Sequence, residues 1–466
     1  MSKPLTCGPV LFEKRGDVVG MIVDLVLANT RAYVDGEIVE CSIAVEGKRV
    51  FKIGRDVNMP KADVKTDLKG LLVLPGLVDA HVHLRDEGKA YKEDFFTGTA
   101  AAAAGGFTTV LDMPNNSPTT MSAEALRQRV ATAENRILVN VGFYSAFPNS
   151  VGSLQGIVEE GVVGFKLFMT EQIGGLDIQD DAALLEAFKT VGKLCSLTAA
   201  HAEDESTLKR AEEQSKRSGR NDVNAFLKVH SEDAEVKAVN RLLSVDREAG
   251  MSLHFCHVST KKGLEAIVWA KKTGLPVTCE VTPHHLFLSS EDLRRVGTLA
   301  VTMPPVRDKV HVEALWDGVR NGSVDIVASD HAPHVLSEKE AENVWDVKVG
   351  VPGLETTLPL LLTEVKRRRL SIGDVVRLMS ERPSEIFRIR GKGMLKSGCD
   401  ADLTVVDLDL KQKINATDFR SKAKYSPFDD RLVEGKAVRT VVGGQMVMED
   451  GEILAKPGSG EIVRRA

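Results

Sequence analysis

The chain has 466 residues, of which 43% are hydrophobic and 27% are charged, and its formal net charge is -5. This composition is ordinary for a globular protein with an ample core, and the small net charge argues against a general nucleic-acid binder. No apolar run is long enough to cross a bilayer and no signal peptide is visible, so we expect a cytoplasmic protein that does not bind membranes. The length predicts one large domain with an accessory domain.

Six cysteines are scattered along the chain without a CxxC pair: Cys7, Cys41, Cys195, Cys256, Cys279 and Cys399. Three of them, Cys195, Cys256 and Cys279, lie inside apolar, strand-like runs. The pattern predicts reduced thiols in the core rather than disulfides.

Short strands joined by turns are expected at both ends of the chain. Alternating runs extend from Met21 to about Ile53, with turn signals at Asp35-Gly36 and Glu46-Gly47. A similar texture returns in residues 400–409 and 437–454. The two strand-rich ends predict one small β domain assembled from both termini.

The middle of the chain alternates apolar, β-branched runs with helical stretches, which is typical of a parallel sheet built from βα units. Eight runs are found: 78–83, 107–112, 137–144, 162–169, 196–201, 252–257, 276–281 and 324–330. Helices are expected between them, for example over 122–136 and 261–272. Eight units in roughly 300 residues predict a closed (β/α)8 barrel. A doubly wound open sheet is the alternative, disfavoured because no glycine-rich phosphate loop follows the first run.

Polar side chains stand in or at the ends of these runs, where a barrel enzyme carries its active site. In "VDAHVHLRDEG", strand alternation places His81 and His83 on the same face. Later runs add Lys166, His201, His257 and Asp330. A single histidine at a strand end is more often structural than a ligand. If the barrel closes, however, four histidines, one lysine and one aspartate converge at the same end.

Three further histidines are expected to stay outside the site. His254 and His257 lie three apart on one strand and point to opposite faces, so we favour His257 as the ligand and His254 as a structural residue. His284 and His285 follow the seventh run, where roles in packing or in orienting ligands are expected.

Lys166 is unusual because it lies inside the apolar stretch "VVGFKLFM". Burial favours its neutral, nucleophilic amine, which could take up carbon dioxide and form a carbamate able to bridge two metal ions. The alternative is a lysine whose ammonium group reaches solvent.

The set as a whole suits metal-assisted hydrolysis of a C–N bond. Histidine and carboxylate ligands fit zinc (Zn2+), and two ions about 3.5–4 Å apart would activate water. Asp330 is the natural proton carrier, since it can accept a proton from that water and pass it to a leaving nitrogen.

At this point the motifs resemble a known family. "DAHVHLR", "GFKLF", "AHAED", "HVST" and "SDHAPH" occur in the order seen in the amidohydrolase superfamily, and the details are similar to class I dihydroorotases. The resemblance covers nearly the whole chain from Met21. The HxH pair is common to many relatives, whereas "MPNN" together with "DHAPH" is much narrower.

The resemblance implies a (β/α)8 barrel with a composite β-sandwich, which we place at residues 78–385 for the barrel and 1–77 with 386–466 for the sandwich. It implies that His81, His83 and Asp330 bind one zinc, that His201 and His257 bind a second, and that carboxylated Lys166 bridges the two. The substrate would be L-dihydroorotate or N-carbamoyl-L-aspartate. Its carboxylate would meet Arg85, Asn115 and His334, while the backbone at Pro352 and Gly353 would touch the ring.

The residues themselves agree with these roles. The guanidinium of Arg85 matches a carboxylate, and Asn115 offers both a donor and an acceptor, although it would also suit a turn. His334 lies on a loop, where a plain surface histidine is the alternative. Departures from the family are Asp86 and Glu87, where a proline is usual, and Met303, where many relatives have asparagine. Some class I members also bridge their metals with an aspartate, and "FKLF" is shared with hydantoinases.

We therefore expect a zinc-dependent cyclic amidohydrolase, a dihydroorotase of pyrimidine biosynthesis. The nearest rival is an allantoinase or hydantoinase (dihydropyrimidinase) with the same metal site, whose substrates lack the carboxylate. A non-catalytic scaffold is the rival from another class, disfavoured because every ligand is present. A homo-oligomer is expected, and association with an aspartate carbamoyltransferase is left open.

Overall fold

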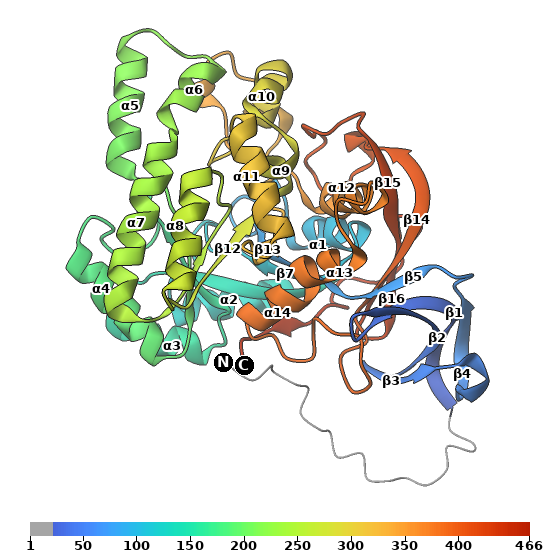
Figure 1. The fold of residues 1–466 in the computed structure, drawn as a ribbon. Coiled ribbons are helices and arrows are strands. Elements are labelled where there is room, and N and C mark those ends of the chain that lie inside the picture. The colour runs from blue at the N-terminus through green and yellow to red at the C-terminus, as the bar shows by residue number, and fades with distance from the viewer. Residues whose placement is uncertain (1–21) are drawn as a thin grey trace.

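The computed structural model describes residues 22–466, which form two sheets; helices surround one of them, and the other lies at one side of it (Figure 1). One sheet is parallel, with the strand order β13-β12-β11-β10-β9-β8-β7-β6. Its strands are β6 (Leu77–Val82), β7 (Phe107–Asp112), β8 (Asn140–Ala146), β9 (Gly164–Phe168), β10 (Leu197–His201), β11 (Ser252–Phe255), β12 (Val277–Val281) and β13 (Ile326–Val327).

The two edges of this sheet meet and close it into a barrel. Val82 and His331 form a parallel bridge, and the N–H of His83 donates to the carbonyl of His331 at 2.8 Å. All eight strands overlap the eight runs expected from the sequence, and the barrel is confirmed. The eighth is the shortest, because the chain leaves regular geometry after Val327.

Helices cover the outside of the barrel and connect its strands (Figure 1). They are α1 (Phe95–Ala104), α2 (Ala123–Glu134), α3 (Leu154–Glu159), α4 (Asp181–Lys193), α5 (Glu205–Arg217), α6 (Val223–Val229), α7 (Glu232–Ala249), α8 (Lys261–Lys272), α9 (Pro283–Phe287), α10 (Ser290–Val296), α11 (Lys309–Arg320), α12 (Leu354–Lys366), α13 (Ile372–Val376) and α14 (Arg382–Ile386). The two helices expected from the sequence are α2 and α8. The side chain of Ser122 caps α2 and that of Thr260 caps α8.

The second sheet is built from both ends of the described chain, as expected. Its order is β17-β16-β15-β14-β5-β1-β2-β3, with β4 paired to β1. The strands are β1 (Ile22–Val34), β2 (Glu37–Glu46), β3 (Arg49–Gly54), β4 (Lys61–Asp67), β5 (Leu72–Pro75), β14 (Leu403–Lys413), β15 (Leu432–Val442), β16 (Gln445–Glu449) and β17 (Glu452–Ile453). The two ends join where β5 pairs antiparallel with β14. Asp35 and Gly36 form the predicted two-residue turn, both with positive φ.

The C-terminal strand β18 (Ile462–Val463) leaves this second sheet and pairs with Val141 and Gly142 of β8 in the barrel. The boundaries at 77/78 and 385/386 stay predictions, and residues 1–21, including Cys7, lie outside the described part. Within residues 22–466, no helix combines the length and apolarity that a membrane span needs.

One cysteine prediction is wrong. Cys256 and Cys279 are buried free thiols, but Cys195 is exposed. It lies in the turn after α4, because β10 begins only at Leu197.

Candidate metal centre and substrate pocket

A cavity of about 440 Å³ opens at the C-terminal ends of the barrel strands. Nine of the eleven predicted site residues line it: His81, His83, Arg85, Asn115, Lys166, His201, His257, Asp330 and His334. They come from segments up to about 250 positions apart in sequence, so closure of the barrel is what brings them together. His254 is not part of this wall, in agreement with the alternation argument.

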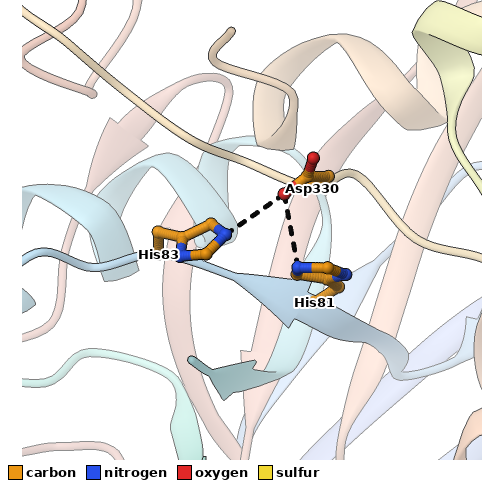
Figure 2. A group of neighbouring side chains, drawn as sticks. All are labelled: His81, His83 and Asp330. Carbon is orange, nitrogen blue, oxygen red and sulfur yellow. Dashed lines mark hydrogen bonds and ion pairs between the residues drawn. The ribbon is translucent and has the colours of Figure 1, made fainter. Parts of the chain in front are cut away.

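Two imidazoles from β6 and its extension converge on one carboxylate oxygen (Figure 2). His81 Nε2 lies 3.3 Å and His83 Nε2 lies 3.2 Å from Asp330 Oδ1. Ligands about 2.0–2.1 Å from a tetrahedral zinc are separated by roughly 3.3–3.4 Å. These three atoms therefore have the spacing of ligands that share one ion, and the donor set fits a metal.

A second pair of imidazoles lies beside the first. His201 Nδ1 and His257 Nε2 are 3.0 Å apart, and the ring centroids of His257 and His81 are 5.3 Å apart. Lys166 is 1% exposed, and its Nζ lies 2.9 Å from the Sγ of Cys256 and above the ring of Phe168. The structure thus buries this lysine in the cavity wall and does not extend it to solvent.

Glu280 on β12 holds the first pair from behind and was missed in the sequence. Its carboxylate accepts from His81 Nδ1, lies 3.1 Å from His254 Nε2 and accepts from the backbone N–H of His257 at 3.2 Å. Burial and Lys166 lower the pKa of His81, but Glu280 and Asp330 outweigh them and raise it to about 10. With this pKa the ring is an imidazolium near neutral pH, so a metal bound at Nε2 would displace a proton while Glu280 keeps the one on Nδ1.

Glu203 and Asn115 each accept the ring proton of another candidate ligand histidine. Glu203 lies 3.0 Å from His201 Nε2, and the Oδ1 of Asn115 accepts from His83 Nδ1 at 2.7 Å. Burial lowers the pKa of His83 to about 3, which keeps it neutral and able to bind a metal. The sequence signal for Glu203 and Glu280 was present, since Glu203 follows the run that ends in His201 and Glu280 is a carboxylate inside the seventh apolar run.

The opposite wall of the cavity is rich in positive charge. Arg85 Nη2 lies 3.4 Å from His334 Nε2, and the Nε of Arg85 is buried without a hydrogen-bond partner. Three further lysines, which the sequence reading had not singled out, line the same wall: Lys89, Lys92 and Lys348. The Nε–H of Arg85 has no acceptor, and several cations lie near it. This wall is therefore suited to bind an anionic group.

Pro352 and Gly353 do not line the cavity; their neighbours Val349 and Gly350 do. The N–H of Gly353 donates to His331 Nδ1 at 3.2 Å. A Cβ at Gly353 would come within 2.8 Å of the carbonyl oxygen of Ser329, so glycine is required for this close approach.

The unusual pair after Arg85 has a structural explanation. Asp86 is buried and forms an ion pair with Arg136 at 2.9 Å, while its carbonyl accepts from the buried Arg129. Glu87 accepts from the hydroxyl of Thr132 at 2.6 Å. The two acidic residues therefore fasten the loop that carries Arg85 to α2.

The family model described as "Amidohydrolase family" matches residues 72–447. The chain belongs to the amidohydrolase family. A dihydroorotase from Methanothermobacter thermautotrophicus is 38% identical over 93% of this chain and 96% of its own length. An L-hydantoinase from Paenarthrobacter aurescens is 35% identical over 95% and 98%. The solved L-hydantoinase (dihydropyrimidinase) from Arthrobacter aurescens superposes with a TM-score of 0.92 at 35% identity, covering 95% of this chain and all of that one.

Within residues 22–466, this amidohydrolase carries two groups of side chains whose ligand atoms lie close enough to share a metal ion. One is His81, His83 and Asp330, and the other is His81, Cys256 and Glu280. Both groups are buried, and His81 belongs to each. The first faces the cavity, whereas Cys256 and Glu280 do not line it.

Proposed function

We propose that this amidohydrolase is a dihydroorotase, which closes N-carbamoyl-L-aspartate into L-dihydroorotate and also hydrolyses that ring. The observation that carries the proposal is the pairing of a metal-ligand group with a cationic wall in one cavity. Ring hydrolysis needs the metal-ligand group, and a substrate with a free carboxylate needs the cationic wall. In this assignment Arg85, His334 and the amide N–H groups of Asn115 receive the carboxylate.

We propose two zinc ions as the metal content. His81, His83 and Asp330 would hold one, His201 and His257 the other, and Lys166, carboxylated by carbon dioxide, would link the two. Zinc held there would supply Lewis-acid activation of water and of the ring carbonyl. Glu280 and Glu203 support this assignment, because each fixes the proton of a ligand histidine on the ring nitrogen that faces away.

Asp330 is the proposed proton carrier. One of its oxygens faces both imidazoles and the other is turned away from them (Figure 2). In hydrolysis the carboxylate accepts a proton from the attacking water, a bond forms between water oxygen and the ring carbonyl carbon, and the C–N bond breaks. Asp330 then returns the proton to the leaving nitrogen. Ring closure runs through the same groups in reverse.

A hydantoinase, dihydropyrimidinase or allantoinase is the competing assignment. An L-hydantoinase is as similar to this chain in sequence as several dihydroorotases are. Allantoin, hydantoin and dihydrouracil carry no carboxylate. On such a substrate the buried guanidinium of Arg85 would stay without an anionic partner, which costs free energy. The cationic wall therefore favours dihydroorotate.

The test is a side-by-side assay of the purified protein on dihydroorotate, hydantoin, allantoin and dihydrouracil, with zinc measured in the same sample. We expect turnover of dihydroorotate and about two zinc ions per chain. Preference for a substrate without a carboxylate would contradict the assignment.

Arg85→Met sharpens this test. Loss of one charge-assisted bidentate contact is expected to lower kcat/KM for dihydroorotate by about 10- to 100-fold while zinc content stays the same. Arg136→Met is the matched control, since Arg136 pairs with Asp86 on the outer side of the same loop. Loss of zinc in Arg85→Met would mean that its role is misassigned.

Homo-oligomerisation, association with an aspartate carbamoyltransferase and a cytoplasmic location are further proposals from the sequence. Sedimentation of the purified chain, alone and mixed with the transferase, tests the first two. Fractionation of the source cells tests the third.

A further inference from the structure

Lys92 lies behind the histidine of the cationic wall. Its side chain is 8% exposed, and its Nζ is 3.0 Å from His334 Nδ1 and 3.0 Å from Glu338 Oε2. The other oxygen of Glu338 accepts from the hydroxyl of Tyr91 at 2.9 Å. Two acceptors on different elements therefore fix the position of the ammonium group.

This contact determines which ring nitrogen of His334 carries the proton. An ammonium group can only donate, so Nδ1 must be the acceptor. The proton of a neutral ring is then on Nε2, which donates to the carbonyl of Val349 at 2.9 Å. Arg85 Nη2 lies 3.4 Å from Nε2 of His334, so a second N–H donor stands beside the Nε2–H of this ring.

The surrounding charges keep the ring neutral. The charged and titratable groups facing His334 are Arg85, Lys92, Glu338, Lys339 and Tyr425. Burial lowers the pKa of His334 well below its usual range, and the positive charges of Arg85, Lys92 and Lys339 lower it further. His334 is 5% exposed, so solvent does little to screen these charges.

We propose that Lys92 is a positioning residue that holds His334 as the neutral Nε2–H tautomer, so that His334 and Arg85 present two adjacent N–H donors to a substrate carboxylate. The carboxylate replaces the carbonyl of Val349 as the acceptor on Nε2. This inference rests on the proposed function for the identity of the substrate, but the state of the ring is a property of the free protein.

Removal of the Lys92 ammonium reverses the preference. Glu338 Oε2 lies 3.2 Å from Nδ1, so the ring then has an acceptor at each nitrogen. Burial and the charges of Arg85 and Lys339 still hold the pKa of the ring low, so the ring stays neutral. The Glu338 carboxylate then draws the single proton to Nδ1, and Nε2 turns its lone pair toward the substrate.

The first test is NMR of the zinc-loaded protein containing labelled histidine, with His334→Asn used to assign the resonance. In the native protein, His334 should show the Nε2–H tautomer and no titration between pH 5.5 and 8.5. In Lys92→Met it should stay neutral over that range but show the Nδ1–H tautomer. Lys92→Arg keeps a cationic donor and should resemble the native protein, as should Lys89→Met, because Lys89 donates to Asn115 instead.

The second test uses kinetics on dihydroorotate. In Lys92→Met the KM should be about tenfold higher than in the native protein throughout pH 6 to 8, while kcat changes little, because one N–H donor to the carboxylate becomes an acceptor. A native His334 that titrates near pH 6.5, or an unchanged His334 in Lys92→Met, would overturn the proposal. If Lys92→Met does not fold, Glu338→Gln replaces it: the native tautomer should persist there, and its loss would count against Lys92. Absence of dihydroorotate turnover together with the expected NMR result would refute only the proposed function.

Discussion

Replacement of Glu280 tests whether the metal centre depends on the carboxylate behind it. In Glu280→Gln the amide oxygen can still accept from His81 and from the backbone of His257, and the amide NH2 can face His254 if that ring changes tautomer. The substitution thus changes a charge-assisted bond to His81 into a neutral one. Such bonds differ by about 1–1.5 kcal/mol, so zinc affinity should fall about tenfold.

Glu280→Ala is the stronger perturbation. It leaves the buried Nδ1–H of His81 without an acceptor, at a cost of up to about 3 kcal/mol. The expected loss of zinc affinity is about 100-fold, at the upper end of the range for residues that orient metal ligands.

Competition with a chromophoric zinc chelator measures both affinities. Urea unfolding of the metal-free variants reports their stability separately. Glu364→Gln is the matched control, because Glu364 is equally buried but pairs with Arg367 and Arg369 on the outer helix α12 and its loop. An unchanged zinc affinity in Glu280→Gln, or an equal loss in the control, would refute the reasoning.

Three further predictions follow from the structure and the chemistry. Lys166→Ala should lose one of two zinc ions and its turnover, with partial recovery of both in a short carboxylic acid; full activity without the acid would exclude the carbamate. Burial raises the pKa of Asp246 from 3.8 to about 6, and its Oδ2 has no partner, so the native state holds this proton more tightly than the unfolded state. The stability of the protein relative to Asp246→Asn should therefore fall by up to about 3 kcal/mol between pH 4 and pH 7 in urea unfolding, and a constant difference would contradict this. Ring closure consumes a proton, so the equilibrium ratio of dihydroorotate to carbamoyl aspartate should fall tenfold per pH unit near neutrality, as chromatography of the mixture would show.

The barrel and its candidate ligands could be predicted because periodicity carries that information. An apolar run places its polar exceptions where neighbouring strands end. His257 and not His254 lines the cavity, as alternation predicts, although His257 lies beyond the last residue of β11. These inferences need only the local chain and closure of the sheet. Arg85 and His334, in contrast, were assigned to one substrate site by the resemblance to the family.

Pairing between distant strands was beyond the same reasoning. Glu280 and His81 are far apart in sequence, and their contact depends on which strands face each other across the barrel. Asn115 was assigned to the substrate, yet its Oδ1 is occupied by His83 and only its N–H groups remain for a ligand. Asp86 and Glu87 were unexplained because their partners lie on α2 and directly after it.

Backbone conformation was also hidden from the sequence at the functional residues. Arg85, His257 and Asp330 have positive φ values of 63°, 34° and 45°. None is a glycine, and such a conformation costs roughly 1–2 kcal/mol per residue. Propensity rules therefore disfavour the geometry that aims these side chains into the cavity, and other contacts must hold it.

Buried carboxylates within the barrel strands supply those contacts. At each of these three positive-φ residues, a carboxylate accepts from the backbone N–H of that residue or of the residue before it. Asp112 accepts from Leu84 at 2.8 Å, Glu280 from His257 at 3.2 Å, and Asp79 from Ser329 at 3.1 Å. Each lies within an apolar strand and is fully buried, where an acidic group is stable only with hydrogen-bond donors. Acidic residues inside the barrel strands thus mark the places where the chain is held out of regular geometry, and in this protein those places are the site.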